Sequence, residues 1–226
     1  MKVATLAHYP VKSTGGESLR KATVDGRGLA HDRRWAAYLE DGGIASGKTT
    51  RRFRKVDGLL AWHSRIVDGT PELREPDGEW LRVDDPAASA ALSSAFGRSL
   101  ELRPETEIRH HDESGVHVVT TSALRQVAQL VGAPVDPRRV RANIVLETDG
   151  VGFVEDDWVG AELAVGPEVV LRLGEGMTRC VMVDYPRGEV PVLRALGRAH
   201  DLLLGLKAHV VRPGVISVGD EAMFVS

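Results

Sequence analysis

Short apolar runs separated by tight-turn residues are the feature that most limits what this chain can fold into. The turns carry residues suited to a positive φ, at Asp25-Gly26, Asp41-Gly42-Gly43, Asp68-Gly69 and Asp77-Gly78. Regular strands with such turns are typical of β-barrels and β-sandwiches. The runs predict strands at residues 3–6, 35–39, 59–63, 81–83, 116–119, 143–146, 168–173 and 209–212.

Helices are predicted at only three places. Residues 86–97 and 123–131 carry apolar side chains at helical spacing, and Thr121 or Ser122 would cap the second helix. Residues 192–204 are rich in Ala and Leu, although Gly197 disfavours a helix there. The predicted fold class is therefore mostly β, of the α+β kind, with a few short helices.

Composition narrows the class of protein. The net charge is -3, and the Lys and Arg residues are scattered, which argues against the basic stripe of a nucleic-acid-binding surface. No apolar run approaches the roughly 20 residues that span a bilayer. Residues 1–10 lack the basic and apolar regions of a secretory signal. We therefore expect a cytoplasmic protein with neither a nucleic acid nor a membrane as a partner.

A polar, histidine-rich stretch at residues 101–115 has the least decided structure. We predict a boundary close to it, with domains at residues 1–98 and 99–226. The cluster of His110, His111, Asp112 and His117 has the residue types of a metal site. Adjacent side chains in an extended segment point in opposite directions, so a solvated loop is the more ordinary interpretation.

Residues 42–49, with the sequence GGIASGKT, match the pattern of a nucleotide-binding P-loop. A P-loop follows a buried parallel strand and opens a helix. Here Asp41-Gly42-Gly43 predicts a hairpin turn, and the residues after Thr49 offer no apolar helix face. We therefore expect a hairpin or a basic loop, with nucleotide binding as an alternative.

Two further places suggest binding or redox chemistry. Arg141 and Asn143 lie two residues apart at the entry to a predicted strand, hence on one face, and would suit an anionic ligand such as a pterin phosphate. Cys180 is the one cysteine of the chain, which excludes an intrachain disulfide and a four-cysteine cluster. A lone cysteine is usually an inert buried side chain. However, the guanidinium of the adjacent Arg179 favours the thiolate, which binds metals or carries sulfur.

Seven motifs occur in order along the chain. They are YPVKS at residues 9–13, GLAHDRRW at 28–35, VVTTSAL at 118–124, RANIV at 141–145, FVEDDWVG at 153–160, Arg179-Cys180, and RPGVISVGD at 212–220. As an ordered set they resemble the MOSC family (molybdenum cofactor sulfurase C-terminal domain) with its N-terminal β-barrel domain. Ala142 departs from the family pattern, which often has proline there. The resemblance implies a MOSC β-barrel packed with an N-terminal β-barrel-like domain.

The resemblance also implies a cofactor and the residues that hold it. The cofactor is the molybdenum cofactor (molybdopterin), without pyridoxal phosphate, and Cys180 would be its molybdenum ligand and the catalytic residue. Lys12, Ser13 and Arg33 would contact the pterin and its phosphate, which needs such cationic donors. A strand-to-helix turn supplies an anion site, and a basic loop at residues 47–49 would face the same pocket. The other positions that carry over are Asp112, Thr120, Thr121, Ser122, Arg141, Asn143 and Arg179. We expect Lys12, Arg33 and Arg141 to line one anion pocket.

The function that follows is that of an oxidoreductase. The chain resembles the mitochondrial amidoxime reducing component and its bacterial relatives, which implies reduction of small N-oxygenated compounds. No cysteine-rich electron-transfer domain is fused to the chain, so a separate electron-donor protein is expected. The alternative is a non-redox role, in which Cys180 carries a persulfide or the protein delivers the cofactor to an acceptor enzyme.

Overall fold

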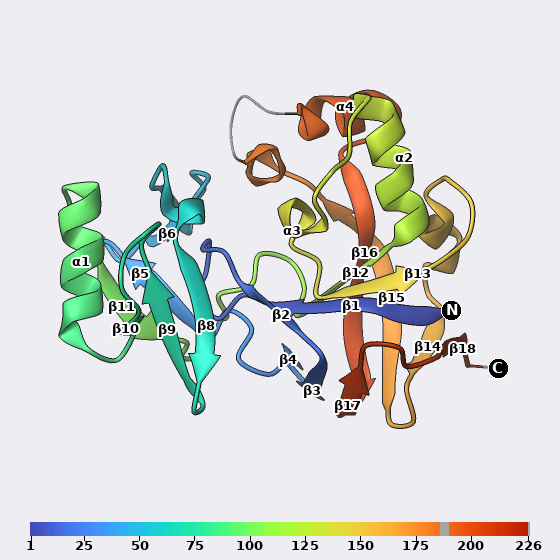
Figure 1. Cartoon of the computed structure of the whole chain (residues 1–226), viewed down its shortest axis with the longest axis horizontal. Helices are drawn as coiled ribbons and strands as arrows, with labels where there is room; N and C mark the ends of the chain where they lie inside the picture. The colour runs from blue at the N-terminus through green and yellow to red at the C-terminus, as the bar shows by residue number, and fades with distance from the viewer. Residues whose placement is uncertain (186–189, 226) are drawn as a thin grey trace. The chain divides into compact units, whose positions relative to one another are not determined.

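The computed structural model describes residues 1–185 and 190–225 (Figure 1). The chain divides into two compact units. The large unit contains Met1–Ala7, Ser18–Ala30 and Glu113–Ser226, and the small unit contains His8–Glu17 and His31–Asp112. The domain boundary predicted between residues 98 and 99 stays a prediction. The last residue of the second predicted domain, Ser226, lies outside the described residues.

The described residues of the large unit contain two β-sheets. The smaller sheet has the strands β3 (Lys21–Asp25), β4 (Gly28–Leu29) and β17 (Gly214–Ser217). The larger sheet has the strands β1 (Lys2–His8), β2 (Glu17–Leu19), β12 (Val116–Thr120), β13 (Ile144–Glu147), β14 (Glu162–Val165), β15 (Val169–Thr178), β16 (Leu203–Arg212) and β18 (Ala222–Phe224). Its order is β18-β14-β15-β16-β12-β13-β1-β2. Strands of both sheets share one apolar core, which includes Val24, Leu146, Leu171 and Ile216, as in a barrel-like arrangement.

Helices cover part of the larger sheet. They are α2 (Thr121–Val131), α3 (Pro137–Val140), α4 (Val192–Ala199) and the 3₁₀ turns η2 (Val154–Trp158) and η3 (Val181–Asp184). The helices α2 and α3 lie in the connection between the parallel strands β12 and β13 (Figure 1). The helix α2 follows β12 directly. It starts where the hydroxyl of Thr120 accepts from the backbone N–H of Ala123, and it ends at Gly132, which has a φ of 73°. Its buried Val127 packs with Leu196 of α4 in a second apolar cluster.

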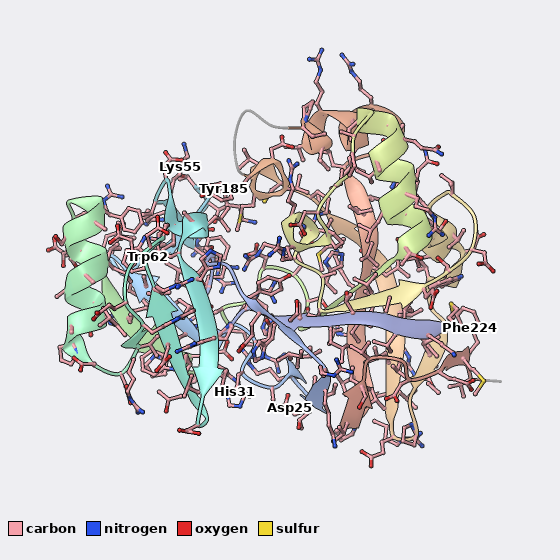
Figure 2. All side chains as sticks on the ribbon, in the orientation of Figure 1. Asp25, His31, Lys55, Trp62, Tyr185 and Phe224 are labelled. Carbon is pink, nitrogen blue, oxygen red and sulfur yellow. The ribbon has the colours of Figure 1, made fainter. Side chains whose placement is uncertain are left out.

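The small unit is built from two short sheets and one helix. One sheet has the order β11-β5-β6-β7, with β5 (Trp35–Tyr38), β6 (Ile44–Ser46), β7 (Phe53–Lys55) and β11 (Glu101–Pro104). The other has the order β10-β9-β8, with β8 (His63–Val67), β9 (Thr70–Arg74) and β10 (Leu81–Arg82). The 3₁₀ turn η1 (Leu59–Ala61) and the helix α1 (Pro86–Phe96) complete it. Leu92 of α1 belongs to the core of this unit. Trp62, which is labelled in Figure 2, belongs to the same core.

The predicted fold class is confirmed: the chain is mostly β with a few short helices. All four predicted turns lie between antiparallel paired strands, as in the β8–β9 hairpin, where Val67 faces Thr70. None of the helices in the described ranges is long and apolar enough to cross a membrane. The expected cytoplasmic location stays a prediction.

Three local predictions were wrong. Residues 59–61 form a 3₁₀ turn instead of a strand, because Gly58 enters it with a φ of 90°. The helix expected at residues 192–204 ends at Ala199, because Asp201 and Leu202 take positive φ values and turn the chain into β16. The N-cap of α2 is Thr120, one residue before the expected Thr121.

Candidate functional site

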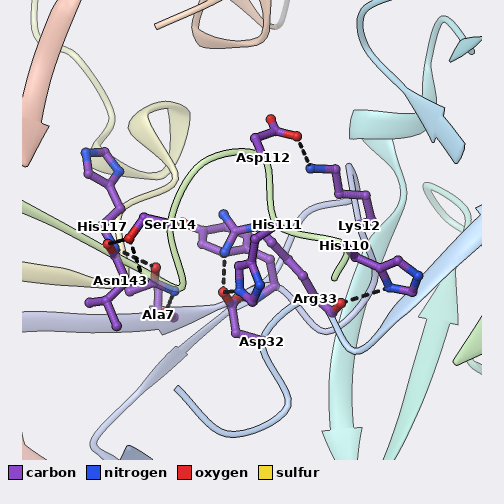
Figure 3. A network of polar contacts seen from close by, with 12 residues as sticks. Ala7, Lys12, Asp32, Arg33, His110, His111, Asp112, Ser114, His117 and Asn143 are labelled. Atoms are coloured by element: carbon purple, nitrogen blue, oxygen red, sulfur yellow. Dashed lines mark hydrogen bonds and ion pairs between the residues drawn. The ribbon is translucent and has the colours of Figure 1, made fainter. Parts of the chain in front are cut away.

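Two lysines share one carboxylate in the small unit. The side chain of Lys12 is 4% exposed, and its Nζ donates a hydrogen bond to Oδ1 of Asp112 (Figure 3). The Nζ of Lys48 lies 3.1 Å from Oδ2 of the same carboxylate. The backbone of Lys12 is fixed by a hydrogen bond from its N–H to the carbonyl of Trp35 in β5. The fold therefore brings together the predicted site residues Lys12 and Asp112 and Lys48 of the expected basic loop.

The charges of this cluster follow from burial and proximity. The pKa of Lys12 is lowered to about 8, first by burial and then by the charges of Arg33 and Lys48, against the opposing effect of Asp112. Burial acts to raise the pKa of Asp112, but Lys12 and Lys48 hold it well below its usual range. At neutral pH two cations therefore face one anion, and the cluster keeps a net positive charge.

A second ion pair fixes the predicted residue Arg33. Its guanidinium donates to Asp32, which is fully buried and also accepts from the backbone N–H of Tyr9 at 2.8 Å. The Nε2 of His111 lies 3.3 Å from the same carboxylate. Burial acts to raise the pKa of Asp32, but Arg33 and His111 hold it well below its usual range. Arg33 itself takes a φ of 52°, and its guanidinium lies 5.0 Å from the ring centroid of Tyr9.

Cations also gather around the ring of Phe53 in β7. The Nζ of Lys12 lies 4.6 Å from its centroid, that of Lys48 5.4 Å, and the guanidinium of Arg52 5.1 Å. An aromatic face attracts cations at such distances. The predicted Ser13 lies in the same unit, almost fully buried, and its hydroxyl donates to Oγ of Ser46 at 3.1 Å.

Residues 42–49 do not have the structure of a nucleotide-binding loop. They form the turn and second strand of the β5–β6 hairpin, with Tyr38 facing Ile44. The residues directly after Thr49 are not helical, and the chain turns back into β7. The expected hairpin is confirmed, and its basic residue Lys48 faces Asp112.

The histidine cluster lies on a loop that leads into the strand β12, as the ordinary interpretation expected, but its histidines are not solvated, so that part was wrong. His110 and His111 are buried in the small unit, and His117 is buried in the large unit. His110 bonds through Nε2 to the hydroxyl of Tyr38 at 2.8 Å. Its Nδ1 bonds to the carbonyl of Arg33 at 3.0 Å (Figure 3). Within residues 1–185 and 190–225, no group of three or more His, Cys, Asp or Glu side chains is arranged to hold a metal ion.

The predicted residues 120–122 lie in the large unit, where β12 meets α2. Their hydroxyls bind other protein groups: Thr120 donates to Glu155 Oε2 at 2.6 Å, Thr121 to the carbonyl of Thr148 and Ser122 to the carbonyl of Gly152. Glu155 is fully buried, and burial raises its pKa despite the bond from Thr120. The family motif at residues 153–160 contained Glu155, but nothing in its spacing indicated a buried partner for Thr120.

Arg141 and Asn143 are not neighbours on one strand face, so that argument was wrong. Arg141 ends α3 with a φ of 57°, and the strand β13 starts only at Ile144. Asn143 is buried: its Oδ1 accepts from the N–H of His117 at 3.0 Å, and its Nδ2 donates to the carbonyl of Ala7. The expectation that Lys12, Arg33 and Arg141 line one pocket stays a prediction, with Arg141 in the large unit and the others in the small unit.

Cys180 lies in the large unit, directly before η3, and is partly exposed. The backbone N–H of the preceding Arg179 donates to the carbonyl of Leu202 at 2.7 Å, and its guanidinium donates to the carbonyl of Val140, which precedes Arg141. Cys180 is therefore not the fully buried side chain that a lone cysteine usually is. The thiol lies instead at the end of a long strand, on an anchored turn.

Comparisons with known proteins give two family matches. Residues 1–114 match the MOSC N-terminal beta barrel domain, and residues 105–223 match the MOSC domain. Among solved structures, the chain is similar to the YuaD protein from Bacillus subtilis, with a TM-score of 0.53 and 18% identity over 98% of this chain and 93% of that one. A weaker match is YiiM from Geobacillus stearothermophilus, with a TM-score of 0.41 and 18% identity over 50% of this chain and 55% of that one. No curated protein matches. Because the two family models together span nearly the whole chain, the protein belongs to the MOSC family, which is associated with molybdenum cofactor binding.

Proposed function

We propose that this protein binds the molybdenum cofactor and reduces small N-hydroxylated compounds, with Cys180 as the molybdenum ligand. The observation that carries the proposal is the setting of Cys180, the one thiol of the chain, which is partly exposed and directly precedes η3. A soft thiolate suits a metal that also carries dithiolene sulfurs. The association of the MOSC family with this cofactor supports the proposal.

The charge of the small unit fits the anionic end of such a cofactor. The Lys12 ammonium is almost fully buried, and the Asp112 carboxylate bonded to it also faces Lys48. A cation held out of water binds a phosphate oxygen strongly, because the hydrogen bond is charge-assisted. We assign Lys12, Ser13, Arg33 and Asp112 to the site that receives the phosphate, with Arg33 oriented by Asp32.

In the large unit we assign the remaining predicted residues to cofactor binding. Arg141 and Arg179 would supply guanidinium groups to its polar part. The backbone at the start of α2 would supply N–H donors of the kind that bind anions. The further assignments are Thr120, Thr121, Ser122 and Asn143.

When bound, the cofactor supplies a metal that exchanges two electrons with the substrate. The reaction consumes two electrons and two protons: the N–O bond of the N–OH group breaks, and the products are the N–H compound and water. A four-cysteine cluster is excluded by the single cysteine. We therefore propose that a separate electron-donor protein supplies the electrons.

The test is to produce the wild type and Cys180→Ser in a host that makes the cofactor. Molybdenum is measured by mass spectrometry, and reduction of an N-hydroxylated model compound is measured with an artificial electron donor. We expect Cys180→Ser to keep its circular dichroism spectrum and to lose bound molybdenum and activity. The neighbouring Val181, whose side chain is exposed, offers a matched control, since Val181→Ala should retain both.

Two results would change the proposal. Equal molybdenum and equal activity in the wild type and Cys180→Ser would refute it. If the wild type holds the cofactor, reduces no N-hydroxylated compound, and Cys180 accepts a persulfide, then the sulfur-carrier function replaces the reductase.

A further inference from the structure

The carboxylate of Asp112 occupies the place of an anionic ligand in the small unit. Its two oxygens are divided between two cations, with Lys12 bonded to Oδ1 and Lys48 at 3.1 Å from Oδ2. Both ammonium groups lie within 5.4 Å of the centroid of the Phe53 ring. This is the arrangement in which two lysines would bind two oxygens of one phosphate.

Asp112 does not balance the charge that surrounds it. Two lysines face its single negative charge, and Arg52, bonded to the backbone carbonyls of Arg109 and His111, adds a cation at the same aromatic ring. The nearby Arg33 is paired with Asp32, so this pair adds no net charge to the cluster. A monoanion that replaced Asp112 would only restore the same charge balance, whereas a phosphate monoester, with about −1.5 to −2 charges, would improve it.

In the ion pair of Asp112 with Lys12, the carboxylate can move away at a lower free-energy cost than the ammonium. The side chain of Asp112 is 31% exposed, whereas that of Lys12 is 4% exposed. A carboxylate that turns toward water recovers its hydration, but the buried ammonium cannot do the same without leaving the core of the unit. Asp112 also lies in the segment between β11 and β12, outside both strands.

We propose that Asp112 is an internal competitor that sets how strongly an anion must bind to occupy the site at Lys12 and Lys48: its carboxylate fills the site until a more strongly bound group, such as a phosphate monoester, displaces it. The inference rests on the proposed function, in which the cofactor's phosphate is the ligand. A displaced competitor lowers the affinity of every anion by the same factor, because each ligand must break the same bridge. Only an anion that binds more strongly than a carboxylate then occupies the site at ordinary concentrations.

The experiment compares two probes on the full chain at about pH 7.5, by NMR titration of the lysine side-chain signals. Glycerol 3-phosphate is a monoester and close to a dianion at this pH, and dimethyl phosphate is a diester and a monoanion. The variant is Asp112→Asn, which keeps the shape of the side chain. The matched control is Asp57→Asn, which removes a surface carboxylate paired with Lys55 in the same unit.

We expect Asp112→Asn to bind both probes more tightly by the same factor of about ten, which corresponds to about 1.4 kcal/mol, close to the value of one charged hydrogen bond. Asp57→Asn should behave as the wild type. Adding Lys48→Gln to Asp112→Asn should remove the gain. A second measurement needs no variant: in the wild type, saturating glycerol 3-phosphate should move the carboxyl carbon signal of Asp112 to that of a solvated carboxylate.

Other outcomes overturn the inference. If Asp112→Asn raises the affinity for the monoester much more than the affinity for the diester, then Asp112 stays in place in the wild type and acts by charge repulsion. If both probes lose affinity or are unchanged, Asp112 supports the lysines or does not affect them. The proposed function is judged separately by molybdenum content: wild type without molybdenum but with equal gains in Asp112→Asn would refute the function and leave the competitor standing. A normal molybdenum content without the increase in probe affinity in Asp112→Asn would refute only the role of Asp112 as a competitor.

Discussion

Replacing Asp32 by Asn tests the buried ion pair on which the position of Arg33 depends. The carboxylate accepts from the N–H of Tyr9 at 2.8 Å and from the guanidinium of Arg33, and His111 lies 3.3 Å away. The Asn side chain can still accept from Tyr9, but it has no negative charge and turns donor hydrogens toward Arg33. Breaking a buried pair costs about 3–5 kcal/mol. Because the Arg33 side chain keeps 14% exposure, we expect the lower end, about 3 kcal/mol.

The assay is urea denaturation followed by tryptophan fluorescence. Trp62 is 3% exposed in the core of the small unit and reports its unfolding. With a typical m-value of about 2 kcal/mol/M, the loss lowers the midpoint by about 1.5 M urea. The control is Asp84→Asn, a surface carboxylate of the same unit paired with Arg82, which should change the midpoint very little.

The pH dependence adds a second check with a definite sign. The pKa of Asp32 is held below its usual range in the folded state. The stability that Asp32 contributes is therefore complete above the ordinary carboxyl value of about 3.9 and is lost as the pH falls below it. The wild type and Asp32→Asn should converge in acid. A shift under about 0.3 M urea at neutral pH, or a difference that grows in acid, would refute the reasoning.

Two further predictions concern Lys12 and a close backbone approach. The pKa of Lys12 is about 8 in the folded state, below its ordinary value of 10.5. Because the unfolded state binds more protons between these two values, the free energy of unfolding should rise with pH across this range by about 3 kcal/mol. Lys12→Met should abolish this rise in denaturation curves, and a rise of equal size in the variant would contradict the assignment. A Cβ on Gly115 would lie 1.9 Å from the carbonyl oxygen of Arg27, so Gly115→Ala should lower stability by about 1–3 kcal/mol. Gly26→Ala, where nothing lies within 4 Å of the added atom, should be close to neutral, and thermal unfolding of both variants measures the difference.

The sequence predicted best the elements that begin and end with special residues. The helix α1 starts at Pro86 after the N-cap Asp85 and ends before Gly97, all readable in the sequence. The turn η1 was mistaken for a strand because an apolar run of this length has no readable period. Strands of three residues, such as β6, are too short to show alternation.

The candidate site could be predicted only in part for a related reason. Motif position named Lys12, Arg33 and Asp112, but the pairing of Asp112 with Lys48 depends on how the β5–β6 hairpin brings a distant residue to it. The left-handed conformation of Arg141 was equally unreadable, because a non-glycine residue in that region depends on its tertiary context. Local patterns therefore identified chemical groups, and long-range pairing decided their partners.

The way the two units share the chain has a consequence for how the protein forms during synthesis. The strand β1 leaves the ribosome long before its partner β13, which begins at Ile144, and β3 leaves long before its partner β17, which begins only at Gly214. The small unit ends at Asp112, so most of it is complete while β1 and β3 still lack these partners. Pairings so distant in sequence form slowly, which leaves apolar β1 exposed for much of translation. A fragment of residues 99–226 would lack β1, β3 and β4, and would expose the core that these strands cover.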